Sequence, residues 1–449
     1  MTITTALTND DALQRGALYR RVAFRIIPIL AICYLIAMID RANVGYAKLQ
    51  LLSDLGFSEA AYGFGAGVFF VGYILFEVPS NIWLHRTGVR RTLLRIMTFW
   101  GVVTMATALV KTPLQFYVAR FLLGAAEGGF FPGLLLYLTY WFPGDRKAKA
   151  YALCMLANPA SGIVGGLLAG GFMSHAEMLG LRGWQILFIV GGAMAVIAGV
   201  VAFFSLADSP RTASWLKAEE RDYIIHEVSR SRASATNSVR AAPHKSVWTD
   251  PRVYMAALAY FTLMSSVSVL SLWGPSIIRS LGVQNAGTVG FVSIIQYLVG
   301  GVGMYLTGAS SDFRRERAWH YVVCAGLIST GAFLLAFVHL SAALSILFLS
   351  MIAFGIYGGY AVFFTIPGEF LEPDDAPAGL AMVTMIGGLG GFVTPSVLGV
   401  IKSATGSLDY GVAFAALLAF LGGLIVAFRF AQWPGQKAAT HDRRLSTEA

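Results

Sequence analysis

The sequence predicts an all-α membrane protein of twelve transmembrane helices, arranged as two pseudo-symmetric halves of six. Of its 449 residues, 56% are hydrophobic and only 13% are charged, and the mean hydropathy is +0.66. A soluble protein of this length would carry about a quarter charged residues. Apolar runs of about 20 residues, long enough to cross the hydrocarbon core, recur along the whole chain. These runs are continuous rather than alternating, which argues against a transmembrane β-barrel.

The apolar runs define the predicted spans, which cover residues 22–42, 60–84, 91–110, 113–140, 147–173, 184–206, 251–279, 286–309, 319–338, 341–367, 377–401 and 410–431. Most connections between them are short. The exception contains the stretch TASWLKAEERDYIIHEV, which predicts an amphipathic helix at the membrane face, followed by a flexible linker. The predicted organisation is therefore an N-terminal tail (1–21), a first half (22–206), a central loop (207–250), a second half (251–431) and a C-terminal tail (432–449).

Two basic turns indicate internal repetition between the halves. SNIWLHRTGVRR follows the second predicted span, and TGASSDFRRERAWH follows the eighth. Each turn therefore stands at the same place in its half. Two six-helix halves around a midplane site are the architecture of a large class of transporters.

The basic residues follow membrane topology. The formal net charge is +9, with 33 Lys and Arg against 24 Asp and Glu. Most of the basic residues fall in the tails and the even-numbered turns, and five fall in the opposite turns: Lys48, Lys111, Arg182, Arg279 and Lys402. By the positive-inside rule we expect both termini in the cytoplasm and a multi-pass protein of the inner (plasma) membrane. This distribution argues against nucleic acid as a partner, and we expect a monomer in the lipid bilayer.

The sequence indicates no cofactor and no metal. Cys33, Cys154 and Cys324 are isolated within apolar runs, where packing is the expected role. No Walker-type phosphate loop is present, so transport driven by ATP is not expected. The acidic residues inside the spans lack a His, Ser or Cys partner arranged as a nucleophile or metal ligand. We therefore do not expect an enzyme.

Four charged residues lie well inside predicted spans of the first half. Asp40 and Arg41 belong to the first span, and Arg120 and Glu127 to the fourth. A charge at the bilayer centre costs about 2.5–3.5 kcal/mol even on the gentlest scale, so such residues usually line a cavity. Arg120 and Glu127 are seven residues apart, which places them on one helix face about 10 Å apart along the axis. A purely structural ion pair is the alternative.

These residue types suit an organic anion coupled to protons. Two guanidinium groups fit a carboxylate better than two lysines would. Acidic neighbours can neutralise the arginines while substrate is absent, and an acid that gives up its arginine partner in an apolar site takes up a proton. We expect Arg41 and Arg120 to bind the carboxylate, and Asp40 and Glu127 to carry protons.

Aromatic and amide side chains in other spans are candidates for the rest of the cavity, although each could instead serve packing: Tyr73, Asn158, Trp273, Gln296, Tyr297, Tyr357 and Phe364.

Three blocks of the sequence resemble a known family. IDRANVGYAKLQLLSDLGFS in the first span, GYILFEVPSNIWLHRTGVRR in the second and RFLLGAAEGGFFPGLLLYLTYWFP in the fourth resemble the anion:cation symporter family of the major facilitator superfamily. The resemblance covers nearly the whole chain and is strongest through residues 34–145. It extends to bacterial tartrate, phthalate and 4-hydroxyphenylacetate permeases, and more distantly to sugar-acid symporters.

The resemblance implies roles for particular residues. Arg41 would contact the anion and Asp40 would be a protonation site. Arg120 and Glu127 would form a pair that opens on protonation. Tyr73 and Asn158 would line the site.

The second half departs from the family pattern. Thr384 and Gly388 stand where relatives often carry asparagines, and Phe364 stands where they often carry Trp. By this resemblance we expect Thr384 also to contact substrate. The loss of these polar groups favours a smaller or aromatic carboxylate over a sugar acid.

The sequence thus predicts a secondary active transporter that imports an organic carboxylate (a hydroxy, aromatic or sugar acid) by proton symport with alternating access. Anion exchange, efflux and a transporter-like sensor that does not transport are the alternatives.

Overall fold

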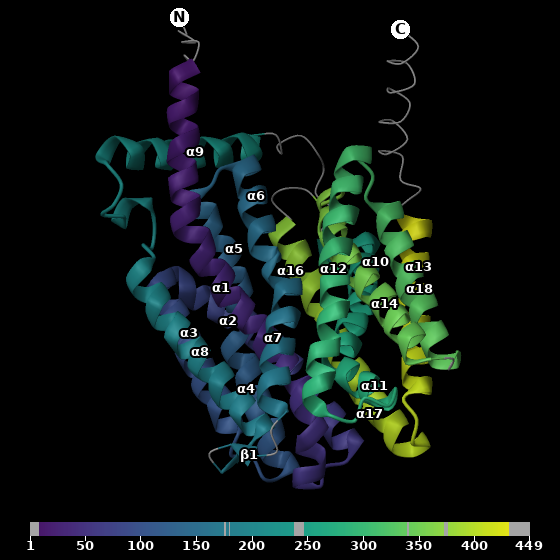
Figure 1. Ribbon diagram of the computed structural model, residues 1–449. Helices are drawn as coiled ribbons and strands as arrows, with labels where there is room; N and C mark the ends of the chain where they lie inside the picture. The colour runs from purple at the N-terminus through teal and green to yellow at the C-terminus, as the bar shows by residue number, and fades with distance from the viewer. Residues whose placement is uncertain are drawn as a thin grey trace, which may run out of the picture.

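The computed structural model describes residues 9–174, 177–178, 180–237, 247–338, 341–371 and 376–430, which are predominantly helical (Figure 1). The first bundle consists of α1 (Asn9–Leu55), α2 (Glu59–Thr87), α3 (Val89–Thr107), α4 (Pro113–Glu127), α5 (Phe130–Trp141), α6 (Gly144–Met155), α7 (Ala157–Met173) and α8 (Gly183–Ser205). Between α7 and α8, the short strands β1 (Glu177–Met178) and β2 (Leu181–Arg182) pair antiparallel, with Glu177 opposite Arg182.

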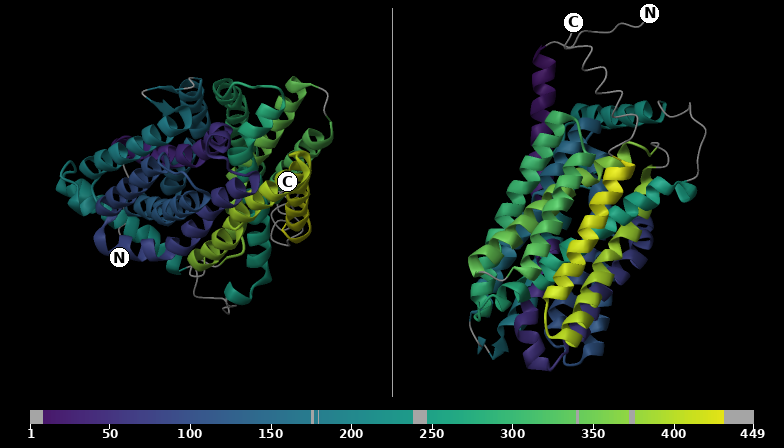
Figure 2. Two further views of the ribbon diagram at one scale, coloured as in Figure 1. Left: turned by 90° about the horizontal axis from the view of Figure 1, so that it is seen from below. Right: turned by 90° about the vertical axis from the view of Figure 1, so that its right-hand side faces the viewer.

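The second bundle follows a connecting region that contains η1 (Pro210–Thr212), α9 (Ala218–Asn237) and η2 (Val247–Thr249). It consists of α10 (Pro251–Ser268), the π-helical turn η3 (Val269–Trp273), α11 (Gly274–Ser280), α12 (Ala286–Arg314), α13 (Ala318–Phe337), α14 (Ala342–Phe363), α15 (Thr365–Gly368), α16 (Ala376–Gly388), α17 (Gly390–Thr405) and α18 (Asp409–Arg429). The purple-to-teal helices of the first bundle and the green-to-yellow helices of the second lie side by side (Figure 2).

Among the described residues, eleven helical segments are long and apolar enough to cross a membrane. The remaining predicted span corresponds to α3, whose first turns carry Arg90, Arg91 and Arg95 and are therefore less apolar. Its buried face packs against α8, where Gly101 and Gly192 bring the two backbones together. The fold is thus the predicted all-helical, twelve-helix membrane architecture.

The first helix is longer than the predicted span. α1 begins at Asn9, inside the predicted tail 1–21, and continues through Leu55, beyond the predicted span 22–42. Lys48 therefore lies in a helix rather than in a turn. Residues 1–8 and 431–449, which include most of the predicted tails, lie outside the described residues.

Five predicted spans are divided into two helical pieces each. The fourth is interrupted at Gly128 and Gly129, the fifth at Leu156, the tenth at Phe364 and the eleventh at Leu389. The seventh changes from α10 through η3 to α11, just before Pro275, which has no N–H to continue an α-helical ladder.

The predicted amphipathic helix of the central loop is present as α9, which lies across one end of the first bundle (Figure 1). We call this the α9 end. Trp215, just before α9, stacks on Trp141 of α5 with ring centroids 5.7 Å apart. Glu220 accepts a hydrogen bond from Arg21 of α1, and this bond lowers the pKa of Glu220. The predicted linker after α9 lies largely outside the described residues.

The two bundles pack together at the end opposite α9. Along the interface between α2 and α17, a Cβ atom added to Gly63 would lie 2.3 Å from the carbonyl oxygen of Pro395. α7 and α12 approach equally closely at Gly166 and Gly290. Beyond Ile74, which contacts Gly388, α2 exposes a series of large side chains toward the α9 end: Leu75, Phe76, Val78, Ile82 and Trp83.

Polar side chains connect the bundles at this closed end. The Lys48 ammonium lies 2.8 Å from the Glu59 carboxylate and 3.4 Å from the ring centroid of Trp273. Lys48 and Trp273 are both buried. The Tyr62 hydroxyl lies 3.0 Å from the carbonyl oxygen of Leu272 and can donate to it, and Arg279 donates to the carbonyl oxygen of Leu49. The Lys48 cation on the indole face of Trp273 and the two hydrogen bonds to backbone carbonyls therefore link the bundles, while the ion pair of Lys48 with Glu59 lies within the first bundle.

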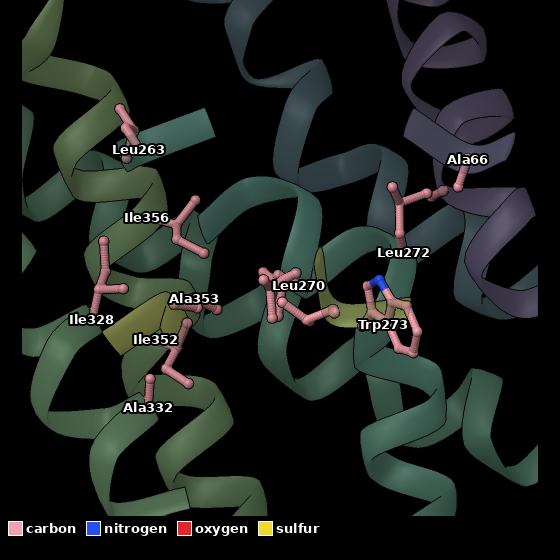
Figure 3. Packing of buried hydrophobic residues seen from close by; sticks show 14 of the residues in the cluster. Ala66, Leu263, Leu270, Leu272, Trp273, Ile328, Ala332, Ile352, Ala353 and Ile356 are labelled. Carbon is pink, nitrogen blue, oxygen red and sulfur yellow. The ribbon is translucent and has the colours of Figure 1, made fainter. Parts of the chain in front are cut away.

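The apolar core continues from the closed end into the second bundle. Figure 3 shows Leu272 and Trp273 of η3 on the side toward Ala66 of α2. Leu270 of the same turn lies on the side toward Ala353 and Ile356 of α14 (Figure 3). The π-helical turn thus contacts both bundles.

Close packing of α2 on α4 yields a stability prediction. A Cβ atom at Gly124 would lie 1.9 Å from the carbonyl oxygen of Phe69. We expect Gly124→Ala to lower the free energy of unfolding by about 1–3 kcal/mol, because the backbones must separate. The measurement is the apparent melting temperature of the purified protein in detergent.

Gly326→Ala is the matched control, because nothing lies within 4 Å of its added Cβ on the exposed face of α13. A Gly124→Ala variant that melts with the parent would show that the two helices can separate without cost.

Candidate functional site

A pocket lies between the bundles, with about 800 Å³ of empty space that is partly continuous with solvent. Helices α1, α2, α4 and α7 line it from the first bundle, and α10, η3, α12 and α14 line it from the second. Five residues predicted for substrate binding are among its lining residues: Arg41, Arg120, Asn158, Tyr297 and Tyr357.

Arg41 and Glu127 form an ion pair at the pocket. Arg41 Nε donates to Glu127 Oε2 at 2.9 Å. The Glu127 side chain is fully buried, whereas that of Arg41 is 26% exposed. The Arg41 guanidinium also lies 4.9 Å from the ring centroid of Tyr73 and 5.1 Å from that of Phe69. Arg41 is thus held by a carboxylate and by two aromatic rings while one part of it faces the cavity.

Arg120 lies on the other side of this arrangement and is almost completely buried. Its guanidinium carbon is 4.8 Å from the ring centroid of the same Phe69. Among the described residues, neither Nε nor Nη1 of Arg120 has a hydrogen-bond partner. A buried guanidinium with unpartnered N–H groups in a pocket is a binding site for an oxyanion.

Asp40 faces away from the pocket although it precedes Arg41. Successive helix residues point about 100° apart, which directs the Asp40 carboxyl toward α3 and α8. Trp100 and Thr104 of α3 lie next to it, but within the described part of the chain neither of its oxygens accepts a hydrogen bond. Asp40 also interacts electrostatically with Arg120. It can balance the charge of Arg120 from behind the pocket wall.

The break between α4 and α5 accounts for the position of Glu127. Glu127 is the last residue of α4, and Gly128 and Gly129 separate it from α5. A Cβ atom at Gly128 would lie 2.5 Å from the carbonyl oxygen of Tyr73. These glycines let α4 approach α2 closely and bring the Glu127 carboxylate to Arg41.

This pairing differs from the one implied by the family resemblance. Arg120 and Glu127 were expected to pair along one helix face, but the partner that hydrogen-bonds Glu127 is Arg41 of α1. Arg120 forms no ion pair with a carboxylate within 4 Å in the described part of the chain. The helix ends directly after Glu127, so its side chain is free to turn toward α1.

The other residues predicted for the site lie around the pocket rather than along its wall. Tyr73 lies under Arg41, and Gln296 is buried with its Nε2 unpartnered within the described residues. Trp273 belongs to the closed end. Phe364 packs on Tyr260 and Tyr360, and the Thr384 hydroxyl donates to the carbonyl oxygen of Ala381.

Sequence reasoning missed several lining residues: Tyr34, Phe69, Phe70, Ser161 and Tyr360. Tyr34 lies two helical turns before Arg41 on the same helix face, so its place in the pocket could have been predicted from this spacing. Phe69 could not be identified, because nothing distinguishes it from other Phe residues of the second span. Within the described residues, no group of three or more His, Cys, Asp or Glu side chains could hold a metal ion.

Residues 30–395 match the model of the Major Facilitator Superfamily. The chain belongs to this superfamily. It is 40% identical over 422 residues to a protein of Agrobacterium vitis named "Putative tartrate transporter", covering 93% of this chain and 92% of that protein. It is 37% identical over 421 residues to the "Quinolone resistance transporter" of Acinetobacter baumannii, covering 94% of this chain and 96% of the relative.

Solved structures share the fold. The inward-open structure of the xylose transporter XylE from E. coli superimposes with a TM-score of 0.73 at 14% identity, covering 91% of this chain and 96% of that one. The protein is therefore a multi-pass membrane transporter and not an enzyme.

The buried pair yields a prediction about stability. We expect Arg41→Met alone to destabilise the protein by about 3–5 kcal/mol, because it leaves the buried Glu127 carboxylate unpaired. Glu127→Leu alone is expected to destabilise it less, because Arg41 is partly exposed to the pocket. The double variant is expected to recover most of this loss. Apparent melting temperatures of the parent, both single variants and the double variant give the coupling.

The Gly326→Ala variant provides the baseline for a substitution without new contacts. If the loss of stability in the double variant equals the sum of the losses in the two single variants, Arg41 and Glu127 are not paired.

Proposed function

We propose that the protein is a secondary active transporter that imports an organic carboxylate, a hydroxy, aromatic or sugar acid, by proton symport. The observation that carries this proposal is the pocket arginine Arg120. Arg120 lines the cavity and has buried N–H groups without a hydrogen-bond partner among the described residues, whereas the other cation of the cavity, Arg41, already has a carboxylate partner. The 40% identical relative named for tartrate is consistent with an organic acid as substrate.

Charge balance supports proton coupling. With both acids ionised, Asp40, Arg41, Arg120 and Glu127 sum to zero charge, and Glu77 of α2, which also interacts electrostatically with Arg41, adds a further acid beside this group. A bound carboxylate leaves this buried group with one net negative charge, which is costly in a low dielectric. Uptake of one proton by Glu127 or Asp40 restores neutrality. Glu127 is the better placed of the two, because its ion pair with Arg41 borders the pocket.

The proposed orientation follows the distribution of basic residues. Both termini and the α9 end are placed in the cytoplasm, in the inner membrane, and the protein acts as a monomer. The tight packing opposite α9 then corresponds to a state closed toward the outside. Transport proceeds by rocking of the two halves, residues 22–206 and 251–431, around the pocket.

Efflux is the second candidate, because the 37% identical relative is named for quinolone resistance. The two directions are distinguished in proteoliposomes with an imposed proton gradient of known sign. Accumulation of an organic acid on the alkaline side supports symport, and accumulation of a quinolone on the acidic side supports efflux.

A first prediction concerns Glu127. We expect Glu127→Gln to abolish accumulation of substrate driven by a pH gradient while exchange of labelled for unlabelled substrate continues. The amide can still contact Arg41 but cannot carry the proton. Both activities are measured in the same proteoliposome preparation.

Asp40→Asn, which lies behind the pocket wall, shows whether the second acid is also required. Undiminished accumulation by Glu127→Gln would contradict the proton role of Glu127.

A second prediction concerns the closed end. The backbone N–H of Ala60 donates to Ser403 Oγ at 3.0 Å across the interface between the bundles. We expect the pair Ala60→Cys and Ser403→Cys to form a disulfide that reduces uptake at least tenfold, because the outside would stay closed. Reductant should restore uptake.

Each single cysteine variant is the control, and the three native cysteines are buried. Normal uptake by the fully cross-linked protein would contradict alternating access through this end.

A further inference from the structure

The two walls of the pocket differ in charge. Arg41 and Arg120 belong to α1 and α4 of the first bundle. The second bundle faces them with uncharged side chains, among them Met264, Val267 and Ile356. Within the described residues, no charged side chain of the second bundle lines the pocket. A ligand therefore meets cations at one end only.

At the cationic end, Arg41 is already paired with a carboxylate, whereas Arg120 forms no ion pair within the described residues. Arg41 Nε is engaged by Glu127, whereas Nε and Nη1 of Arg120 have no partner among the described residues. One carboxylate satisfies Arg120. A second carboxylate at the far end of a ligand would be desolvated against apolar side chains without a partner. This arrangement favours a monocarboxylate.

The wall of the second bundle is aromatic as well as uncharged. Tyr297 and Tyr357 line it, with their rings in an edge-to-face arrangement and their centroids 6.3 Å apart. The Tyr297 ring lies directly against Gly162 of α7, where a Cβ atom would be 2.0 Å from its Cδ1. Backbone packing therefore fixes this ring before a ligand arrives.

Tyr360 extends the aromatic wall by nearly one helical turn. Its ring contacts that of Phe364, with centroids 5.7 Å apart, and that of Tyr260, at 6.5 Å. A row of rings held from behind favours a planar ligand, because edge-to-face and offset-stacked contacts require little adjustment. A flexible polyhydroxylated chain would leave most of this surface without matching contacts.

We propose that the substrate is an aromatic monocarboxylate, with its carboxylate on Arg120 and its ring against Tyr297, Tyr357 and Tyr360. This inference rests on the proposed function and specifies its substrate class. It separates this site from one that binds a dicarboxylate such as tartrate, the acid named for one of its relatives.

The first experiment compares ligands on the purified full-length protein by thermal shift, and by competition in counterflow without a proton gradient. The probes are benzoate, terephthalate, tartrate, gluconate and the neutral benzamide. We expect benzoate to bind at least tenfold more tightly than each of the other four. Terephthalate, which carries a second carboxylate, tests whether the far end of the pocket rejects a charge. Benzamide, which carries none, tests whether Arg120 requires a carboxylate.

The outcomes separate the two proposals. Tighter binding of tartrate, gluconate or terephthalate than of benzoate overturns the aromatic monocarboxylate and leaves carboxylate transport standing. Binding of benzamide alone, or of none of the four acids, contradicts both.

The second experiment tests the aromatic wall with a matched pair of variants. We expect Tyr360→Leu to weaken benzoate binding at least fivefold, whereas Tyr360→Phe, which keeps the ring, binds like the parent. Equal losses in both variants would assign the role to the hydroxyl and overturn the stacking.

A third experiment places a charge on the wall of the second bundle. Met264→Lys, compared with Met264→Leu, should raise terephthalate affinity about tenfold relative to benzoate. An unchanged ratio would show that the ligand does not reach this wall.

Discussion

Four charged side chains at the pocket wall of the first bundle constrain the rest of this structure. Asp40, Arg120 and Glu127 are buried and Arg41 is only partly exposed, so each must be balanced by a neighbour. A single ring, Phe69, lies beneath both arginines and gives each cation a favourable surface. The backbone of Phe69 in turn packs on Gly124. Charge balance, ring position and helix spacing thus depend on one another.

The need to balance these charges also accounts for the interruption of the helix that carries Glu127. Glu127 reaches Arg41 because α4 stops at two glycines, and the π-helical turn before Pro275 frees the second bundle to contact the first. An uninterrupted helix would fix each side chain at the angle set by its position in the sequence. The breaks allow side chains to be aimed at the pocket.

Much of the fold could be predicted, because it depends on long apolar runs and on basic turns that are visible in the sequence. Arg41 and Arg120 could be placed in the pocket because buried charges are rare. The sequence could not show which of these two arginines pairs with Glu127, because the direction of the Glu127 side chain depends on where α4 ends. Tyr360 was missed in favour of Phe364, four residues later, because α14 stops at Phe363 and the pocket ends before it. Thr384 was placed by analogy, and its hydroxyl instead serves its own helix.

The buried Lys48 has a consequence for how tightly the protein can bind from outside. Its contact with Trp273 joins the two bundles and is lost when that end opens, whereas Glu59 belongs to the same bundle as Lys48. The free energy of the contacts between the bundles, that of Lys48 with Trp273 among them, therefore sets the fraction of molecules whose pocket faces the outside at any moment. The apparent dissociation constant for external substrate is the intrinsic constant divided by that fraction, and each 1.4 kcal/mol in these contacts changes it about tenfold. Affinity measured on one face of the membrane thus reports partly on residues that the substrate never touches.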